Sequence, residues 1–119
     1  MGEIMEHILV YDIISSGMKT TLFGSDGTIA AEAYRELSVK FGEDTAEQSP
    51  QSWLDAMKTT TAEVLKKVKD ANIKGISFTA MSTVCLCVDK DGKPLQDAFT
   101  WSDSRGGRLE DNLGKKYPE

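Results

Sequence analysis

The sequence predicts a mixed α/β domain with the element order β-β-β-α-β. Three observations support this fold class. Apolar segments of strand length, separated by tight turns, occupy the first third of the chain. A long segment with apolar residues every three to four positions follows, which is typical of a helix that packs on a sheet. A short segment rich in β-branched and aromatic residues comes next. We therefore expect a mixed sheet with one helix packed on it.

The first three strands are expected near residues 8–13, 19–23 and 28–37. Ser15, Ser16 and Gly17 form a tight turn between the first two, and residues 24–27 form the second turn. The first hairpin thus places the Asp12 carboxylate, two hydroxyls and a flexible backbone at one end, and such groups bind phosphate and Mg²⁺. The alternative is an ordinary turn with a solvated aspartate beside it.

The helix is expected from Pro50 to about Ala71. Ser49 is a good N-cap, and proline suits the first helical position because its missing N–H has no helical partner there. Asn72 is expected to end the helix in a left-handed conformation. One apolar stripe defines the buried face: Trp53, Met57, Thr60, Val64 and Val68.

The remaining elements are expected to be shorter. Residues 75–80 predict a buried strand, residues 84–88 a second one, and residues 108–113 a helix. Residues 89–92 resemble the opening of a calcium loop, but the glycine comes too early and the distal glutamate is missing. We expect an ordinary turn there.

Composition excludes some classes of partner. The net charge is −5 and no lysine–arginine cluster offsets it, which argues against nucleic-acid binding. No stretch approaches the ~20 apolar residues of a membrane span, and the N-terminus is too acidic for a signal peptide. Cys85 and Cys87 are expected to be buried and reduced, with the cytoplasm as the compartment. His7 is expected to be solvated.

The order of elements is that of the ribonuclease H-like unit of actin-like ATPases and sugar kinases. Five segments, in order, resemble the N-terminal part of FGGY-type carbohydrate kinases of the xylulokinase and gluconokinase branch. Residues 12–19 resemble the family's Asp-Ile-Gly-Thr-Ser/Thr-x-x-Lys, and residues 100–105 resemble its Trp-x-Asp-x-Arg. The other matches are residues 46–53, 75–80 and 88–95. The resemblance implies that residues 1–119 are a truncated part of the first kinase domain.

The resemblance also implies ATP- and Mg²⁺-dependent phosphorylation of a hydroxyl of a sugar, ketose or sugar acid. By the match, Asp12 would face the metal or its water shell. The residues that would approach the transferring phosphate are Ser15, Ser16 and Lys19. The residues that would lie near the sugar are Ser82, Thr83, Trp101, Asp103 and Arg105. Structural roles are the alternatives: Trp101 in a core, Asp103 and Arg105 as a surface ion pair, and Lys19 as a solvated strand residue.

Two positions depart from the family pattern. Ile14 stands where the family has glycine, and we expect its bulk and restricted backbone to weaken nucleotide binding. Ser82 and Thr83 stand where gluconokinases and xylulokinases have a sugar-contacting Met-His pair, so the sugar preference does not carry over.

No aspartate of this chain matches the family's catalytic-base motif, which the resemblance places beyond this segment. We therefore expect the chain alone to be inactive, and to self-associate through an exposed sheet edge or an uncovered core face. A non-catalytic binding or regulatory module derived from a degenerate kinase is one alternative. An actin-like ATPase without a sugar substrate is another.

Overall fold

A computed structural model describes residues 4–117, which form two compact units. The first unit comprises the residues up to Ser38 together with Gln51–Met81. The second comprises Val39–Pro50 and the residues from Ser82 on.

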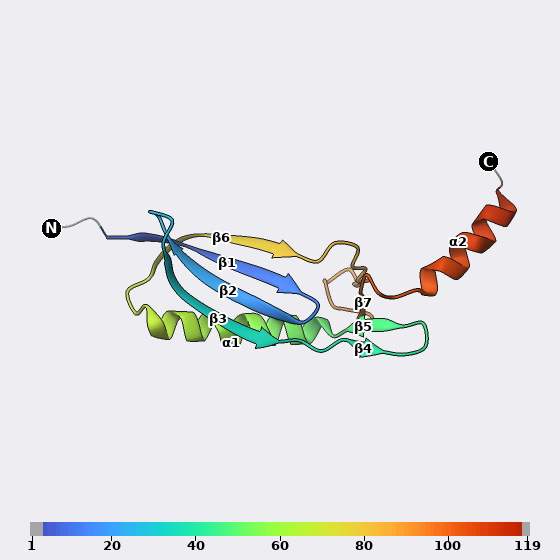
Figure 1. Ribbon diagram of the computed structural model, residues 1–119, viewed down its shortest axis with the longest axis horizontal. Coiled ribbons are helices and arrows are strands. Elements are labelled where there is room, and N and C mark those ends of the chain that lie inside the picture. The colour runs from blue at the N-terminus through green and yellow to red at the C-terminus, as the bar shows by residue number, and fades with distance from the viewer. Residues whose placement is uncertain (1–3, 118–119) are drawn as a thin grey trace. The chain divides into compact units, whose positions relative to one another are not determined.

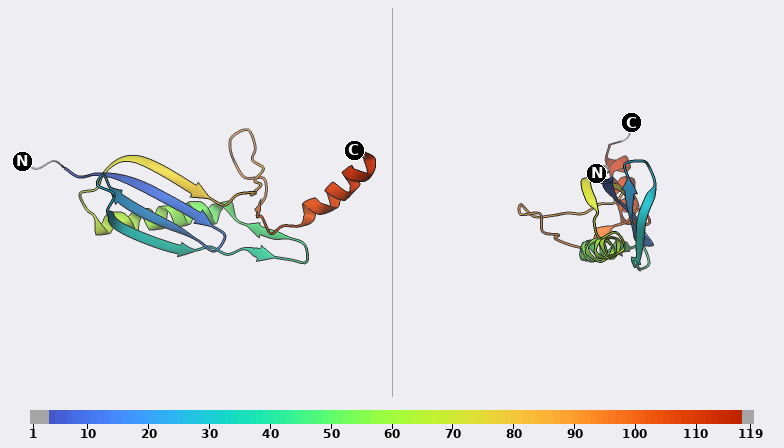
Figure 2. Two further views of the ribbon diagram at one scale, coloured as in Figure 1. Left: turned by 45° about the horizontal axis from the view of Figure 1, so that its top comes forward. Right: turned by 90° about the vertical axis from the view of Figure 1, so that its left-hand side faces the viewer.

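The first unit is a four-stranded mixed sheet with a helix on one face (Figures 1 and 2). Its strands are β1 (Glu6–Ile14), β2 (Gly17–Gly24), β3 (Ile29–Glu36) and β6 (Asn72–Ala80), in the order β3-β2-β1-β6. β1 pairs antiparallel with β2 and parallel with β6. Because parallel neighbours need a crossover, the chain passes through α1 (Pro50–Lys67) before it returns as β6. The predicted β-β-β-α-β order and mixed sheet are confirmed.

The core lies between α1 and the sheet. Met18, Leu22 and Val64 are completely buried, and Trp53 and Met57 of α1 pack against them. Trp53, Met57 and Val64 belong to the apolar stripe that the sequence predicts for α1. The spacing of three to four residues therefore identified the helix face correctly.

Two hydrogen bonds between hydroxyl groups link α1 to the sheet within this core. The Thr20 and Thr60 hydroxyls lie 2.6 Å apart and both residues are fully buried, while the Tyr11 and Thr61 hydroxyls lie 2.7 Å apart. Since an unpaired buried hydroxyl is costly, these pairs specify the position of the helix as well as stabilise it.

The alternation of side chains along β1 decides which groups α1 covers. Leu9 and Tyr11 point toward α1, so Asp12 points to the opposite face. Lys19 lies directly across from Asp12 on β2 and shares that face. Of the predicted phosphate-side residues, Asp12 and Lys19 therefore lie on the sheet face opposite α1.

The end of the helix and the surroundings of the histidine differ from expectation. α1 ends at Lys67, four positions before Ala71, and Asn72 is the first residue of β6 rather than a helix cap. The Asn72 N–H donates to His7 Nδ1 over 3.3 Å. His7 is only 6% exposed, so the prediction of a solvated histidine was wrong. It alternates with Leu9 and Tyr11 and therefore lies on the covered face of β1.

β6 is confirmed as a strand, but it is not buried. Most of its residues are exposed because it is the edge strand of the sheet. Its apolar composition indicated a buried strand, and its position at the edge of the described sheet could not be derived from that composition alone.

The second unit is built from shorter elements. β4 (Lys40–Phe41), β5 (Ala46–Gln48) and β7 (Ala98–Phe99) form a three-stranded sheet, and α2 (Arg105–Lys116) follows. The strand expected at residues 84–88 is reduced to isolated bridges at Cys85 and Val88. Cys85 and Cys87 are free and exposed, which corrects the prediction that they are buried. Neither helix in the described part of the chain is long and apolar enough to cross a membrane.

We predict that Thr60→Ala destabilises the first unit by about 1–3 kcal/mol, because it leaves the buried Thr20 hydroxyl without its partner. Thr59→Ala is the matched control, since the exposed Thr59 makes the same kind of bond to the carbonyl four residues earlier. Urea unfolding of the two variants measures the difference. Equal losses would contradict a special role for the buried pair.

Candidate functional site

The turn between β1 and β2 carries the predicted phosphate-side residues. Ile14 pairs with Gly17, and Ser15 and Ser16 form the turn between them. Ser16 is exposed and Ser15 is half-buried. Asp12, in register with Lys19, stands two residues before the turn. The structure therefore brings one carboxylate, one ammonium group and two hydroxyls to one end of a hairpin.

The turn is held in place by β3 and the residue that follows it. The Ser16 carbonyl accepts the Tyr34 hydroxyl over 3.0 Å and the Leu37 N–H over 3.0 Å. Gly17 makes room for this arrangement, since a Cβ there would lie 2.1 Å from the Tyr34 hydroxyl. Sequence reasoning missed Tyr34, because a contact between residues 18 positions apart has no local signal.

Lys19 is oriented by an acidic neighbour. Its Nζ lies 3.4 Å from a carboxylate oxygen of Glu32, which also accepts the Thr21 hydroxyl over 3.1 Å. About half of the Lys19 side chain remains exposed. Exposed pairs of this kind contribute about 0–1 kcal/mol, so the lysine can exchange Glu32 for another anion at little cost.

Ile14 does not strain the turn. Thr83 is the only non-glycine residue with a positive φ in the described part of the chain, so the backbone at Ile14 needs no glycine. The turn lies at Ser15 and Ser16, so the restricted backbone of Ile14 is accommodated, and the expected weakening of nucleotide binding stays a prediction. The bulk of the half-exposed Ile14 side chain beside the hydroxyls remains.

The residues of this turn fit a magnesium ion that arrives with a phosphate. Among the described residues there is no group of three or more histidine, cysteine, aspartate or glutamate side chains that could hold a metal. Mg²⁺ in phosphate-transfer sites is commonly bound through one or two carboxylates, with waters and phosphate oxygens completing the shell. Asp12 can supply such a single carboxylate, directly or through water.

In the second unit, Asp103 and Arg105 belong to a network rather than to a simple surface pair. The Asp103 carboxylate accepts the Ala46 N–H over 2.9 Å and the Arg105 Nη2 over 2.6 Å, and only 5% of its side chain is exposed. The same guanidinium donates to Glu47 over 2.6 Å and lies 4.1 Å from the centre of the Phe99 ring. Arg105 therefore joins the start of α2 to β5 and β7.

The network shifts the pKa values of both of its central groups. The hydrogen bonds from Arg105 and from the Ala46 N–H hold the pKa of Asp103 well below its usual range. The Asp103 and Glu47 carboxylates raise the pKa of the Arg105 guanidinium above its usual value. Both groups therefore stay charged, and each already has partners.

The other predicted sugar-side residues are open to solvent. Trp101 is 64% exposed, so it is not a core residue. Ser82 and Thr83 are exposed, and Thr83 has a φ of +54°. A β-branched residue in the left-handed region is strained, and such strain clusters at functional positions.

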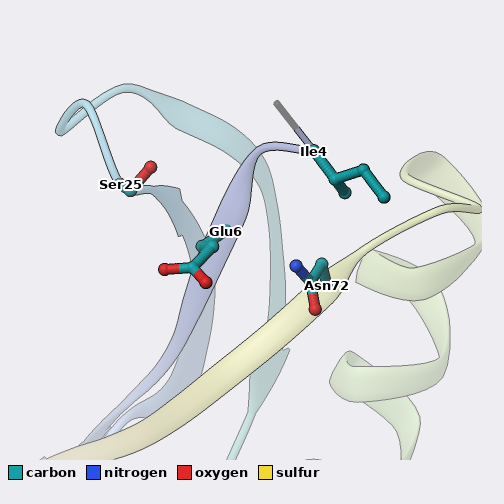
Figure 3. A pocket seen from close by; sticks show the side chains of 4 residues that line it. All are labelled: Ile4, Glu6, Ser25 and Asn72. Carbon is teal, nitrogen blue, oxygen red and sulfur yellow. The ribbon is translucent and has the colours of Figure 1, made fainter. Parts of the chain in front are cut away.

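A separate pocket lies at the other end of the first unit's sheet (Figure 3). It is lined by Ile4, Glu6, Ser25 and Asn72. Ser25 belongs to the turn between β2 and β3, whereas the predicted phosphate-side residues surround the turn between β1 and β2. This pocket therefore does not include any of the predicted site residues.

Comparison with known proteins places the chain among kinases. The sequence model of the N-terminal domain of the FGGY family of carbohydrate kinases matches residues 7–118. A glycerol kinase of Trichormus variabilis is 33% identical over 92% of this chain. A gluconokinase and a xylulose kinase of Bacillus subtilis are 29% and 28% identical over 83% and 85% of it. The chain spans only 20–23% of the length of these relatives.

Solved structures show the same fold. The xylulose kinase of Rhodospirillum rubrum superposes with a TM-score of 0.87 and 23% identity, covering 95% of this chain and 24% of its own. The gluconate kinase of Lactobacillus acidophilus superposes with a TM-score of 0.86 and 18% identity, covering 95% of this chain and 23% of its own. The expected ribonuclease H-like fold, as found in FGGY kinases, is therefore confirmed.

We predict that Gly17→Ala destabilises the first unit by about 1 kcal/mol, because the Tyr34 ring must move and its hydroxyl loses the Ser16 carbonyl. Gly75→Ala is the control, since an added Cβ there meets no atom within 4 Å. In a Tyr34→Ala background the cost of Gly17→Ala should disappear. Urea unfolding measures the stability of each variant. A cost of Gly17→Ala that persists in the Tyr34→Ala background would contradict the explanation.

We also predict a pH profile for Asp103. A lowered pKa means that its charge stabilises the folded second unit fully above about pH 4, and that this stabilisation is lost only as the pH falls through the lower, folded pKa. The NMR shift of the Ala46 amide proton, bound to Asp103, should therefore stay constant from pH 7 to about 3.

Asp103→Asn should lower the urea midpoint of the second unit at pH 7, whereas Asp111→Asn on the exposed face of α2 should not. Trp101 fluorescence in a Trp53→Phe background follows this unit. A titration of the Ala46 shift centred near pH 4 would show instead an ordinary, unpaired carboxyl.

Proposed function

The chain belongs to the FGGY family of carbohydrate kinases, and we propose that it is the N-terminal part of an ATP-dependent kinase that phosphorylates a hydroxyl of a sugar, ketose, sugar acid or polyol. The named relatives are glycerol, gluconate and xylulose kinases, and each represents a different member of this substrate class. The particular substrate stays open.

The observation that carries the proposal is the β1–β2 hairpin. Its turn carries two serines, and the facing pair Asp12 and Lys19 stands two residues from the turn, on the sheet face opposite α1. Phosphoryl transfer depends mainly on positioning and on neutralising charge at the phosphate oxygens. A braced turn with hydroxyl and ammonium donors is suited to both tasks.

We assign the following roles within the hairpin. Ser15 and Ser16 donate hydrogen bonds to phosphate oxygens, and Lys19 leaves Glu32 to neutralise phosphate charge. Asp12 would hold the water shell of the Mg²⁺ that accompanies ATP, and the bound metal would neutralise charge on the phosphate oxygens. By the family resemblance the catalytic base lies beyond the matched segment, so we expect no sugar phosphorylation by residues 1–119 alone.

In the second unit, we assign sugar contact to Trp101, Ser82 and Thr83. An exposed aromatic ring and two exposed hydroxyls suit a ligand with apolar ring or chain faces and many hydroxyls. We assign Asp103 and Arg105 the role of holding this segment in place, since their charged groups already satisfy each other.

A second candidate function is a non-catalytic binding or regulatory module derived from a degenerate kinase. Ile14 favours it, because a large apolar side chain stands where the family has glycine beside the phosphate-side turn.

We place the protein in the cytoplasm. Its two cysteines are free and exposed, a state that a reducing compartment maintains. No nucleic-acid partner is proposed, in keeping with the net charge of −5.

We predict that Mg²⁺-ATP binds the chain weakly, with a dissociation constant of about 1 mM, because only part of a nucleotide site is present. A ¹⁵N NMR titration should shift the amide signals of residues 14–19 and leave those around the Figure 3 pocket unchanged. Asp12→Asn and Lys19→Gln should each weaken binding several-fold. Adenosine with Mg²⁺ is the control, since it has no phosphate.

Ile14→Gly separates the two candidate functions. A kinase hairpin should bind Mg²⁺-ATP as well as before or more tightly once the bulk at position 14 is removed. No binding by the parent sequence and none by the variant would favour the module. Parallel titrations with glycerol, gluconate and xylulose, followed at Trp101, test the sugar assignment independently.

A further inference from the structure

The side chain of Tyr34 reaches from β3 to the turn between β1 and β2, and we propose that Tyr34 is a positioning residue of this phosphate-side turn. The role rests on the function proposed above, since it concerns how Ser15 and Ser16 meet a phosphate. The Tyr34 hydroxyl donates to the Ser16 carbonyl over 3.0 Å. Tyr34 lies outside all five segments that resemble the family motifs, so the resemblance assigns it no role.

The backbone of this turn lacks the conformation that two-residue hairpin turns usually adopt. Ile14 pairs with Gly17, so Ser15 and Ser16 are the two turn residues. The favoured types, I′ and II′, need a positive φ at one or both of these positions, because their twist then matches that of the strands. Neither serine, both within the described residues, has a positive φ. The hairpin is therefore closed by a turn that the usual preference of a two-residue loop does not select.

The turn at the other end of β2 shows the opposite arrangement. Gly27 has a φ of +84°, which glycine adopts without strain. The Asp26 carboxylate accepts the Thr28 N–H over 3.0 Å and the Thr28 hydroxyl over 2.7 Å. Residues 24–28 thus contain the groups that determine their own turn. The contrast points to a determinant outside the turn at Ser15 and Ser16.

The determinant is the end of β3 and the residue that follows it. The Ser16 carbonyl accepts both the Tyr34 hydroxyl and the Leu37 N–H, each over 3.0 Å, so both of its lone pairs are used. The peptide unit that contains this carbonyl is planar, so the two bonds fix the orientation of the plane between Ser16 and Gly17. This orientation sets the backbone from which the Ser16 side chain projects.

The Tyr34 ring is itself held over Gly17. Tyr34 faces Lys19 across the strands, but its ring leans by two positions toward the turn, where a Cβ on Gly17 would overlap the ring and its hydroxyl. Diagonal contacts of this kind are within reach of aromatic side chains. Tyr34 therefore acts through a contact within the sheet, which needs no exposed surface.

A turn that is set before binding costs less to order around a phosphate. Without the Tyr34 hydroxyl, the turn keeps only the Leu37 N–H at the Ser16 carbonyl, and the favoured hairpin turn types compete with the present one. The two serines then have the binding geometry in only a fraction of the molecules. The apparent dissociation constant for phosphate rises by the inverse of that fraction.

NMR of the chain without ligand tests the conformational step. Tyr34→Phe removes only the hydroxyl, and we expect exchange broadening at residues 15–17 or a strong NOE between the amide and α protons of a turn serine, the sign of a positive φ. Tyr11→Phe is the matched control, since it removes a hydroxyl that lies 2.7 Å from that of Thr61 on the opposite sheet face. The control should lower the urea midpoint without altering the turn. Sharp signals and negative φ at both serines in Tyr34→Phe would overturn the proposal.

A second background tests whether the hydroxyl acts through the turn conformation. Ser15→Asn with Ser16→Gly supplies the sequence that forms a type I′ turn without help. In this background Tyr34→Phe should no longer broaden the signals of residues 15–17. Broadening of the same size in both backgrounds would show that Tyr34 does not act by selecting the turn, and would overturn the proposal.

Titration with Mg²⁺-ATP measures the consequence for binding. Tyr34→Phe should raise the dissociation constant about threefold to tenfold, which corresponds to a competent fraction of about a third to a tenth. Tyr11→Phe should leave the dissociation constant unchanged. If the parent chain does not bind Mg²⁺-ATP, the proposed phosphate site is refuted. If it binds and the two variants have equal affinities, only the role of Tyr34 is refuted.

Discussion

The attachment of α1 to the sheet is the constraint on which the rest of the first unit depends. The buried contact between the Thr20 and Thr60 hydroxyls fixes the helix over β2, and the Tyr11–Thr61 contact fixes its rotation. Once these contacts are made, the alternation of side chains along a strand determines which sheet face each residue of β1 and β2 occupies. Asp12 must point away from the helix, and Lys19, which faces it on β2, must do the same. The face on which the phosphate-side charges lie is thus a consequence of how the helix packs.

The two units organise their functional groups by different means. In the first, a small residue and a tyrosine hold a turn: Gly17 leaves space, and the Tyr34 hydroxyl uses it to reach the Ser16 carbonyl. In the second, ion pairs have this role, since the Arg105 guanidinium donates hydrogen bonds to both Asp103 and Glu47. Both arrangements restrict the local backbone before any ligand arrives, which reduces the entropy that binding must overcome.

The sequence predicted the fold well where the signal was local. Periodicity identified the strands, the face of α1 and the turn at Ser15 and Ser16, because each depends on residues a few positions apart. It failed where burial depends on distant partners. His7 is buried and accepts the N–H of Asn72, a residue 65 positions away, whereas Cys85 is exposed and is joined to Phe99 by an isolated bridge. The contact between Arg105 and Glu47 was not predicted, because the two residues lie 58 positions apart and spacing carries no information over that distance.

The structure also divides the residues of the family motifs into two kinds. Lys19 forms one exposed ion pair, and breaking it costs about 0–1 kcal/mol, so a phosphate with its greater charge can displace Glu32. Arg105 makes several charge-assisted hydrogen bonds to two carboxylates and lies on an aromatic ring, so a neutral polyol cannot compete for it. A residue of a family motif can therefore serve to hold the local structure together rather than to contact a ligand. On this basis we propose Lys19 and Trp101 as contact residues, and Asp103 and Arg105 as residues that hold the segment carrying Trp101 in place.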